Sequence, residues 1–123
     1  MALISLGVVA LDCPDPRALA DFYAELLGWR AEGEDDWYEV AGPDGRKLAF
    51  QQVADYRPPQ WPGQDAPQQL HLDFDVRPAD IDEAERKVLA LGAKLVQSDD
   101  GVRDWRVYLD PAGHPFCLCL TER

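Results

Sequence analysis

Basic residues are scarce in this sequence. It holds 12 lysines and arginines against 23 aspartates and glutamates, which gives a net charge of −11. Nucleic acids and anionic membranes both require a basic face on their partner, so this balance argues against both. Long hydrophobic runs are also missing, because no stretch approaches the roughly 20 apolar residues of a membrane span. The first residues lack a basic start and a long apolar run, so we expect no signal peptide.

Cysteine is rare and odd in number, with Cys13, Cys117 and Cys119 only. An odd count without a secretory leader provides no disulfide framework. We therefore expect reduced thiols and a cytoplasmic location. The length of 123 residues, of which 46% are hydrophobic, is that of one domain spanning residues 1–123 with a sizeable core.

The first half of the chain alternates strand and helix signals. The mostly apolar segment 4–12 predicts a strand, which Cys13-Pro14-Asp15-Pro16 ends. Asp15 is expected to cap a helix that begins at Pro16 and ends at Gly28. Further strands are predicted between Trp29 and Gly33, over 37–40 and over 47–53, with a turn at Gly42-Pro43-Asp44-Gly45.

The second half repeats this order after a proline-rich loop at residues 54–68. Asp80 and Glu83 predict a cap pair for a helix that Gly92 ends. Strands are predicted over 69–76, 94–97, 105–109 and 116–120. Each half is therefore a strand, a helix and three strands, with module one at about 1–53 and module two at about 69–123.

The two modules can be aligned against each other. The segment from Pro43 to Gln51 is echoed by the segment from Pro111 to Cys119. His71 follows Val8 by 63 residues and Cys117 follows Ala49 by 68, and a loop insertion accommodates the difference. Because side chains alternate across a strand, these four residues are predicted to face one cavity.

The pattern resembles the vicinal oxygen chelate superfamily, which includes glyoxalases, extradiol dioxygenases and bleomycin-resistance proteins. The last segment, together with Trp61-Pro62-Gly63-Gln64, most resembles its glyoxalase-like domain group. The other carriers of the resemblance are Asp15 with Asp21-Phe22-Tyr23 and Leu27-Gly28-Trp29, His71-Leu72-Asp73-Phe74-Asp75-Val76, Ala90-Leu91-Gly92-Ala93 and Asp110-Pro111-Ala112-Gly113-His114-Pro115-Phe116-Cys117-Leu118.

The resemblance implies an α+β fold in which two βαβββ modules form a half-barrel sheet with flanking helices around a ligand site. It also implies a homodimer. In metal-using members each module supplies one ligand from its first strand and one from its last, which here are Val8, Ala49, His71 and Cys117. Valine and alanine have no donor atom, and Cys117 replaces the usual glutamate. We therefore expect no metal, with a divalent metal on His71, Cys117 and Gln51 or Cys119 as an alternative.

Several candidate site residues keep two interpretations. His71 is a candidate catalytic acid/base or ligand partner, or a vestigial pocket histidine. Asp73 and Asp75 are paired carboxylates for proton transfer, or solvated groups partnered by a cation such as Arg106. The predicted ligand-binding residues are Val8, Ala49, Gln51, Trp61, His71, Asp73, Trp105, Cys117 and Cys119.

Trp61 and the two cysteines also allow more than one role. Trp61 is either a flat wall over a ligand or a residue that packs its loop. The two cysteines are small, soft pocket linings rather than nucleophiles.

We expect a small-molecule binding domain that is metal-independent and holds an apolar or aromatic metabolite, with drug sequestration as one form. The alternative is an enzyme of the same superfamily, a lyase, isomerase or dioxygenase. It would use a degenerate metal site or metal-free acid/base chemistry by His71. A third interpretation is a structural partner domain with an empty pocket.

Overall fold

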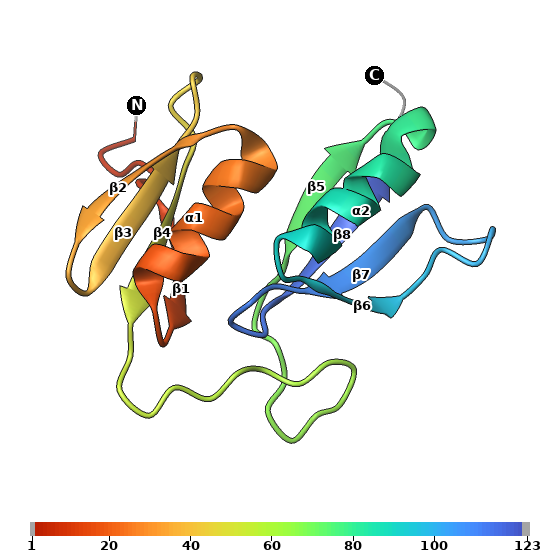
Figure 1. Ribbon diagram of the computed structural model, residues 1–123. Helices are drawn as coiled ribbons and strands as arrows, with labels where there is room; N and C mark the ends of the chain where they lie inside the picture. Colours follow the sequence, from red (N-terminus) through yellow and green to blue (C-terminus); the bar gives the residue numbers. More distant parts are fainter. Residues whose placement is uncertain (1, 122–123) are drawn as a thin grey trace. The chain divides into compact units, whose positions relative to one another are not determined.

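The computed structural model describes residues 2–121, which form two compact units that divide between Tyr56 and Arg57 (Figure 1). Each unit is a strand, a helix and three further strands, and each contains one four-stranded sheet. The predicted α+β class and the two βαβββ modules are confirmed. Neither sheet closes into a barrel, because each keeps two edge strands.

The first unit places one helix on a four-stranded sheet of order β1-β4-β3-β2. The β1 and β4 strands are parallel and the other neighbours are antiparallel. Tyr23 of the helix stacks on Phe50 of β4 with ring centroids 5.5 Å apart, and both side chains are fully buried. The elements are β1 (Val9–Cys13), α1 (Pro16–Leu27), β2 (Arg30–Glu34), β3 (Trp37–Ala41) and β4 (Lys47–Gln52).

The ends of α1 follow the local sequence as predicted. The Asp15 side chain accepts a hydrogen bond from the Ala18 backbone N–H at 3.2 Å, and Pro16 occupies the first turn. Gly28 ends the helix with a left-handed φ of 68°. The strand predicted after Trp29 is present as β2.

The second unit has the same arrangement, with sheet order β5-β8-β7-β6. The β5 and β8 strands are parallel and the other neighbours are antiparallel. Its core centres on Phe116 of β8, which stacks on Tyr108 and meets Phe74 edge-on. The elements are β5 (Leu72–Val76), η1 (Pro78–Asp80), α2 (Ile81–Ala90), β6 (Lys94–Gln97), β7 (Trp105–Leu109) and β8 (Pro115–Leu120).

The strand registers confirm the internal alignment of the two modules. Val9 pairs with Leu48 in the first sheet, and Leu72 pairs with Phe116 in the second. These pairs are separated by the same 63 and 68 residues that the sequence comparison indicated. The two turns match as well, since the backbone N–H of Gly45 donates to the Gly42 carbonyl and that of Gly113 donates to the Asp110 carbonyl.

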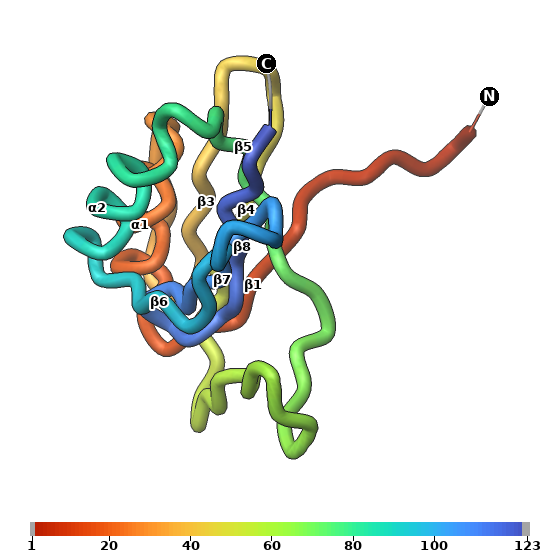
Figure 2. The backbone as a smooth tube through the Cα atoms, turned by 90° about the vertical axis from the view of Figure 1, so that its right-hand side faces the viewer, coloured from red at the N-terminus to blue at the C-terminus, as the bar shows by residue number. Residues whose placement is uncertain are grey.

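Two predicted strands begin later than expected. The prediction of a strand from residue 4 is wrong, because β1 starts at Val9, where its pairing with β4 starts. Figure 2 shows the preceding residues running away from the sheet, and Leu3, Ile4 and Leu6 are more than 80% exposed. Similarly, β5 starts at Leu72 rather than residue 69, because its partner β8 begins at Pro115. Apolar sequence alone does not extend a strand beyond its partner.

The predicted cap pair at the second helix is wrong. A short 3-10 turn, η1, precedes α2, and the Asp80 carboxylate accepts a hydrogen bond from Arg77 Nε at 3.2 Å instead of capping the helix. The helix still ends close to Gly92, whose φ is 113°. Within residues 2–121, no helix combines the length and apolar character that a membrane crossing requires.

Candidate functional site

A cavity of about 350 Å³ lies within the second unit, on the sheet face opposite the aromatic core. Strands β7 and β8 supply its floor, the start of β5 supplies one side, and the loop before β5 supplies the rest. Its lining residues are Trp61, Gln68, His71, Asp73, Trp105, Val107, Pro115, Cys117 and Cys119.

Strand alternation explains which side chains line this cavity. In β8, Phe116 and Leu118 are buried at 0% and 2% exposure and face the core, so the cysteines between and after them face the other way. The register places Val107 beside Cys117 and Trp105 beside Cys119. The floor is therefore a two-strand platform of apolar and sulfur-containing side chains with one indole at its end.

The loop before β5 contributes Trp61 from outside the sheet. The backbone N–H of Gln60 donates to the Ala66 carbonyl at 2.6 Å, which closes the loop around the tryptophan. Gly113 makes room for this loop at the turn before β8, since a Cβ there would lie 2.7 Å from the Cβ of Pro58. The Trp61 side chain is half-buried and lines the cavity, as predicted for a wall over a ligand.

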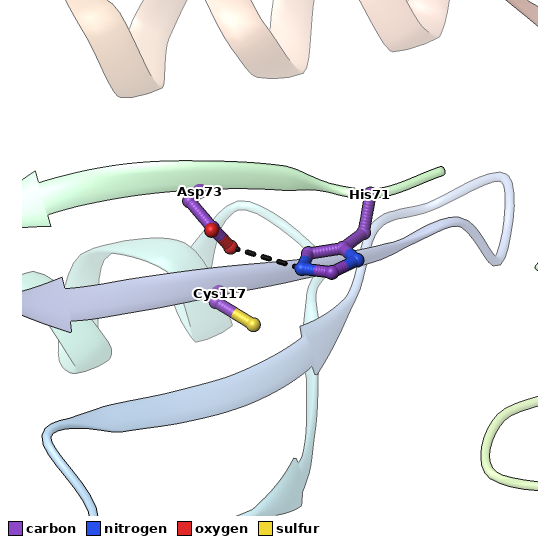
Figure 3. A group of neighbouring side chains, drawn as sticks. All are labelled: His71, Asp73 and Cys117. Carbon is purple, nitrogen blue, oxygen red and sulfur yellow. Dashed lines mark ion pairs between the residues drawn. The ribbon is translucent and has the colours of Figure 1, made fainter. Parts of the chain in front are cut away.

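Three polar donors meet at one end of the cavity (Figure 3). The parallel register places Asp73 directly beside Cys117, and His71 precedes Asp73 by two residues on the same side of the chain. His71 Nε2 lies 3.2 Å from Asp73 Oδ1. One donor atom from each of the three residues falls within 4.8 Å of the others.

Both cavity thiols are held in their neutral form. Burial, together with the negative charge of Asp73, raises the pKa of Cys117 to about 12. The same two causes, with a contribution from Asp75, raise the pKa of Cys119 to about 11. Because the thiolate is the reactive species, these surroundings disfavour a nucleophilic role for either cysteine in the metal-free protein.

The suggestion that Arg106 partners Asp73 or Asp75 is wrong. Arg106 lies between Trp105 and Val107 in β7, so alternation turns it to the helix-bearing face. There its guanidinium pairs with three carboxylates, those of Asp82 at 3.1 Å, Glu85 at 3.3 Å and Asp99 at 3.0 Å.

The comparison with known families covers nearly the whole chain. Residues 8–119 match the model of a family described as a glyoxalase-like domain. The chain belongs to the glyoxalase-like domain family. No curated protein matches it.

Solved structures of this family share the fold at low sequence identity. A glyoxalase/dioxygenase from Nostoc punctiforme is 21% identical with a TM-score of 0.71, over 98% of this chain and 93% of that one. A glyoxalase-related enzyme from Fulvimarina pelagi is 20% identical with a TM-score of 0.70, over 97% and 89%.

A fosfomycin resistance protein has the same fold. The FosX protein of Listeria monocytogenes, solved as a mutant with Mn(II) and 1S,2S-dihydroxypropylphosphonic acid, is 13% identical with a TM-score of 0.75, over 98% of this chain and 95% of that one. At these identities the likeness shows the fold alone.

The metal ligand set that the resemblance implied does not fit this glyoxalase-like chain. Two of its four positions, Val8 and Ala49, have hydrocarbon side chains, and Ala49 is fully buried. The internal alignment makes Ala10 the counterpart of Asp73, so the first module has no donor at any position equivalent to the cluster. The second module alone has a set of donors that could hold an ion, namely His71, Asp73 and Cys117.

The other predicted ligand-binding residues divide between the two units. Val8, Ala49 and Gln51 belong to the first unit, where Val8 precedes β1 and Gln51 lies exposed in β4. Trp61, His71, Asp73, Trp105, Cys117 and Cys119 all line the cavity of the second.

Three lining residues were missed. Val107 and Pro115 follow from alternation, two residues from Trp105 and Cys117, whereas no sequence signal marks Gln68.

Proposed function

We propose that this glyoxalase-like protein binds a small apolar or aromatic molecule in the cavity of its second module. The observation that supports this most strongly is the pairing of two indoles, Trp61 and Trp105, around a floor that includes Val107 and Cys117. A volume of about 350 Å³ suits a small organic molecule. Tryptophan provides a large apolar surface with a preferred stacking geometry, so a planar ligand is favoured.

Binding of this molecule is metal-independent in our proposal. The apolar floor and the indoles supply the affinity by removing hydrocarbon surface from water, which requires no ion. The His71 and Asp73 end provides polar contacts that orient the ligand. Sequestration of a drug-like or secondary metabolite is one form that such binding takes.

Tryptophan fluorescence tests this proposal directly. Protein held in EDTA is titrated with planar aromatic metabolites, with 2-naphthol as a neutral reference probe. We expect saturable quenching that weakens when Trp61 is replaced by alanine, because Trp61 lines the cavity. The proposal fails if no compound changes the emission, or if quenching requires added metal.

The second candidate function is an enzyme of the same superfamily, a lyase, isomerase or dioxygenase. The observation in its favour is the His71–Asp73 pair at 3.2 Å beside the cavity. A histidine oriented by a carboxylate is suited to acid/base catalysis near neutral pH. Mass spectrometry of bound compounds after incubation tests it: a product that disappears in His71→Gln supports turnover, and unchanged compounds support binding alone.

We also propose that the protein is a cytoplasmic homodimer. The family resemblance supports the dimer, and the cysteines without a disulfide framework support the reducing compartment. Sedimentation as a monomer at micromolar concentration contradicts the dimer.

A further inference from the structure

The polar end of the cavity has the composition of a metal site that differs from the set implied by the resemblance. His71 and Cys117 occupy two of the positions named by that resemblance, but the third donor, Asp73, does not. It comes from the same strand face as His71 and lies opposite Cys117 in the parallel register. A single sheet edge thus brings together an imidazole, a carboxylate and a thiol, with no contribution from the first module.

We propose that the second module binds a thiophilic divalent cation, zinc or its analogue cadmium, through His71, Asp73 and Cys117. Asp73 takes the place of the donors that Val8 and Ala49 lack. This site does not depend on the proposed organic ligand, since its three donors belong to the protein.

The geometry is close to that of a zinc site. The three donor atoms lie within 4.8 Å of one another, and His71 and Asp73 are already 3.2 Å apart. Ligands bonded to tetrahedral zinc at about 2.0–2.3 Å stand roughly 3.3–3.8 Å apart. Closing the remaining gap requires about 1 Å of side-chain movement. The side chains of His71 and Asp73 are 40% and 56% exposed, so they have space to move.

Charge and ligand softness select the kind of ion. A neutral imidazole, one carboxylate and one thiolate carry two negative charges, which a divalent cation neutralises beside the 7%-exposed Cys117. Thiolate ligands favour zinc and related soft ions, whereas magnesium and manganese favour oxygen ligands. Three protein ligands leave a fourth position for water or a bound molecule.

Metal retention and ultraviolet absorption test the proposal. The full chain is stripped with EDTA, returned to chelator-free buffer, loaded with zinc alone, passed through gel filtration and assayed for bound metal by mass spectrometry. Parallel samples with cadmium report thiolate coordination through ligand-to-metal absorption. We expect one zinc per chain, binding of manganese weaker by about tenfold or more, and a cadmium–thiolate band.

Matched variants on the same two strands separate the site from general surface charge. Asp73→Asn is expected to weaken zinc binding by about tenfold or more, whereas Asp75→Asn, the next exposed carboxylate of β5, retains it. Cys117→Ser removes the cadmium band and Cys119→Ser keeps it. Circular dichroism verifies that each variant is folded, and Cys117→Ala is the substitute if Cys117→Ser does not fold.

Three outcomes overturn the metal site: no zinc is retained, Asp73→Asn and Asp75→Asn bind zinc equally, or the cadmium band survives in Cys117→Ser. Zinc binding is measured without an organic ligand, and 2-naphthol binding is measured in EDTA. Failure of the metal site is therefore distinguishable from failure of the proposed organic-ligand binding.

Discussion

Replacement of Trp105 by alanine measures how much of the cavity's affinity comes from its floor. Trp105 is 43% exposed although it is a large apolar residue, so much of its indole is available to a ligand. A tryptophan offers about 250 Å² of surface, so roughly 110 Å² is accessible, and a planar ligand on one face covers about 50 Å². At about 25 cal/mol per Å², this contact contributes about 1.3 kcal/mol, or roughly a tenfold change in Kd.

The repeat provides a matched control for this substitution. Trp37 in β3 pairs with Gln51 as Trp105 in β7 pairs with Cys119, so the two tryptophans occupy equivalent positions in their own sheets. The indole of Trp37 donates a hydrogen bond to Glu39 at 3.0 Å and lies outside the cavity of the second module. We therefore expect Trp105→Ala to raise the Kd for 2-naphthol about tenfold and Trp37→Ala to leave it unchanged.

Calorimetric titration of 2-naphthol in EDTA measures both dissociation constants without relying on tryptophan emission. Urea unfolding of each variant controls for stability. An unchanged Kd in Trp105→Ala, or an equal loss in Trp37→Ala, would refute the assignment of binding to this cavity.

Two further predictions concern the thiols and the first module. In EDTA-treated protein, Cys117 and Cys119 should react with iodoacetamide far more slowly at pH 8 than an ordinary thiol of pKa 9.0, because their pKa values are about 12 and about 11. The neutral thiols favour folding below pH 9, and this contribution is lost as the pH rises from 9 towards 12, so the urea midpoint should fall there and fall less in Cys117→Ala; fast alkylation at pH 8 contradicts this. Gly42→Ala should cost about 1–3 kcal/mol in unfolding free energy, because the new Cβ would lie 2.7 Å from the indole of Trp29. Gly7→Ala, which meets nothing within 4 Å, is the control, and equal urea midpoints for the two variants would disprove the clash.

The secondary structure was predictable because its signals are local. The Asp15 cap, the Gly28 stop and the alternation in β8 each depend on a few neighbouring residues, and each is present in the structure. The repeat extended this to register: a constant offset between modules identified which positions are equivalent before any pairing was known. The missed features were strand starts at Val9 and Leu72, which depend on where the partner strand begins.

The site was predictable only in part, for the same physical reason. Alternation by itself determined that His71, Asp73 and Cys117 turn away from the core, because the direction of a side chain in a strand is a local property. Only the tertiary structure decided that Asp73 lies beside Cys117 and that Trp61 closes over the same cavity. It also turned Arg106 away from Asp73 and towards Asp82, Glu85 and Asp99. Those contacts join residues far apart in the chain, and their distances depend on how strands pair and loops close, which no local pattern encodes.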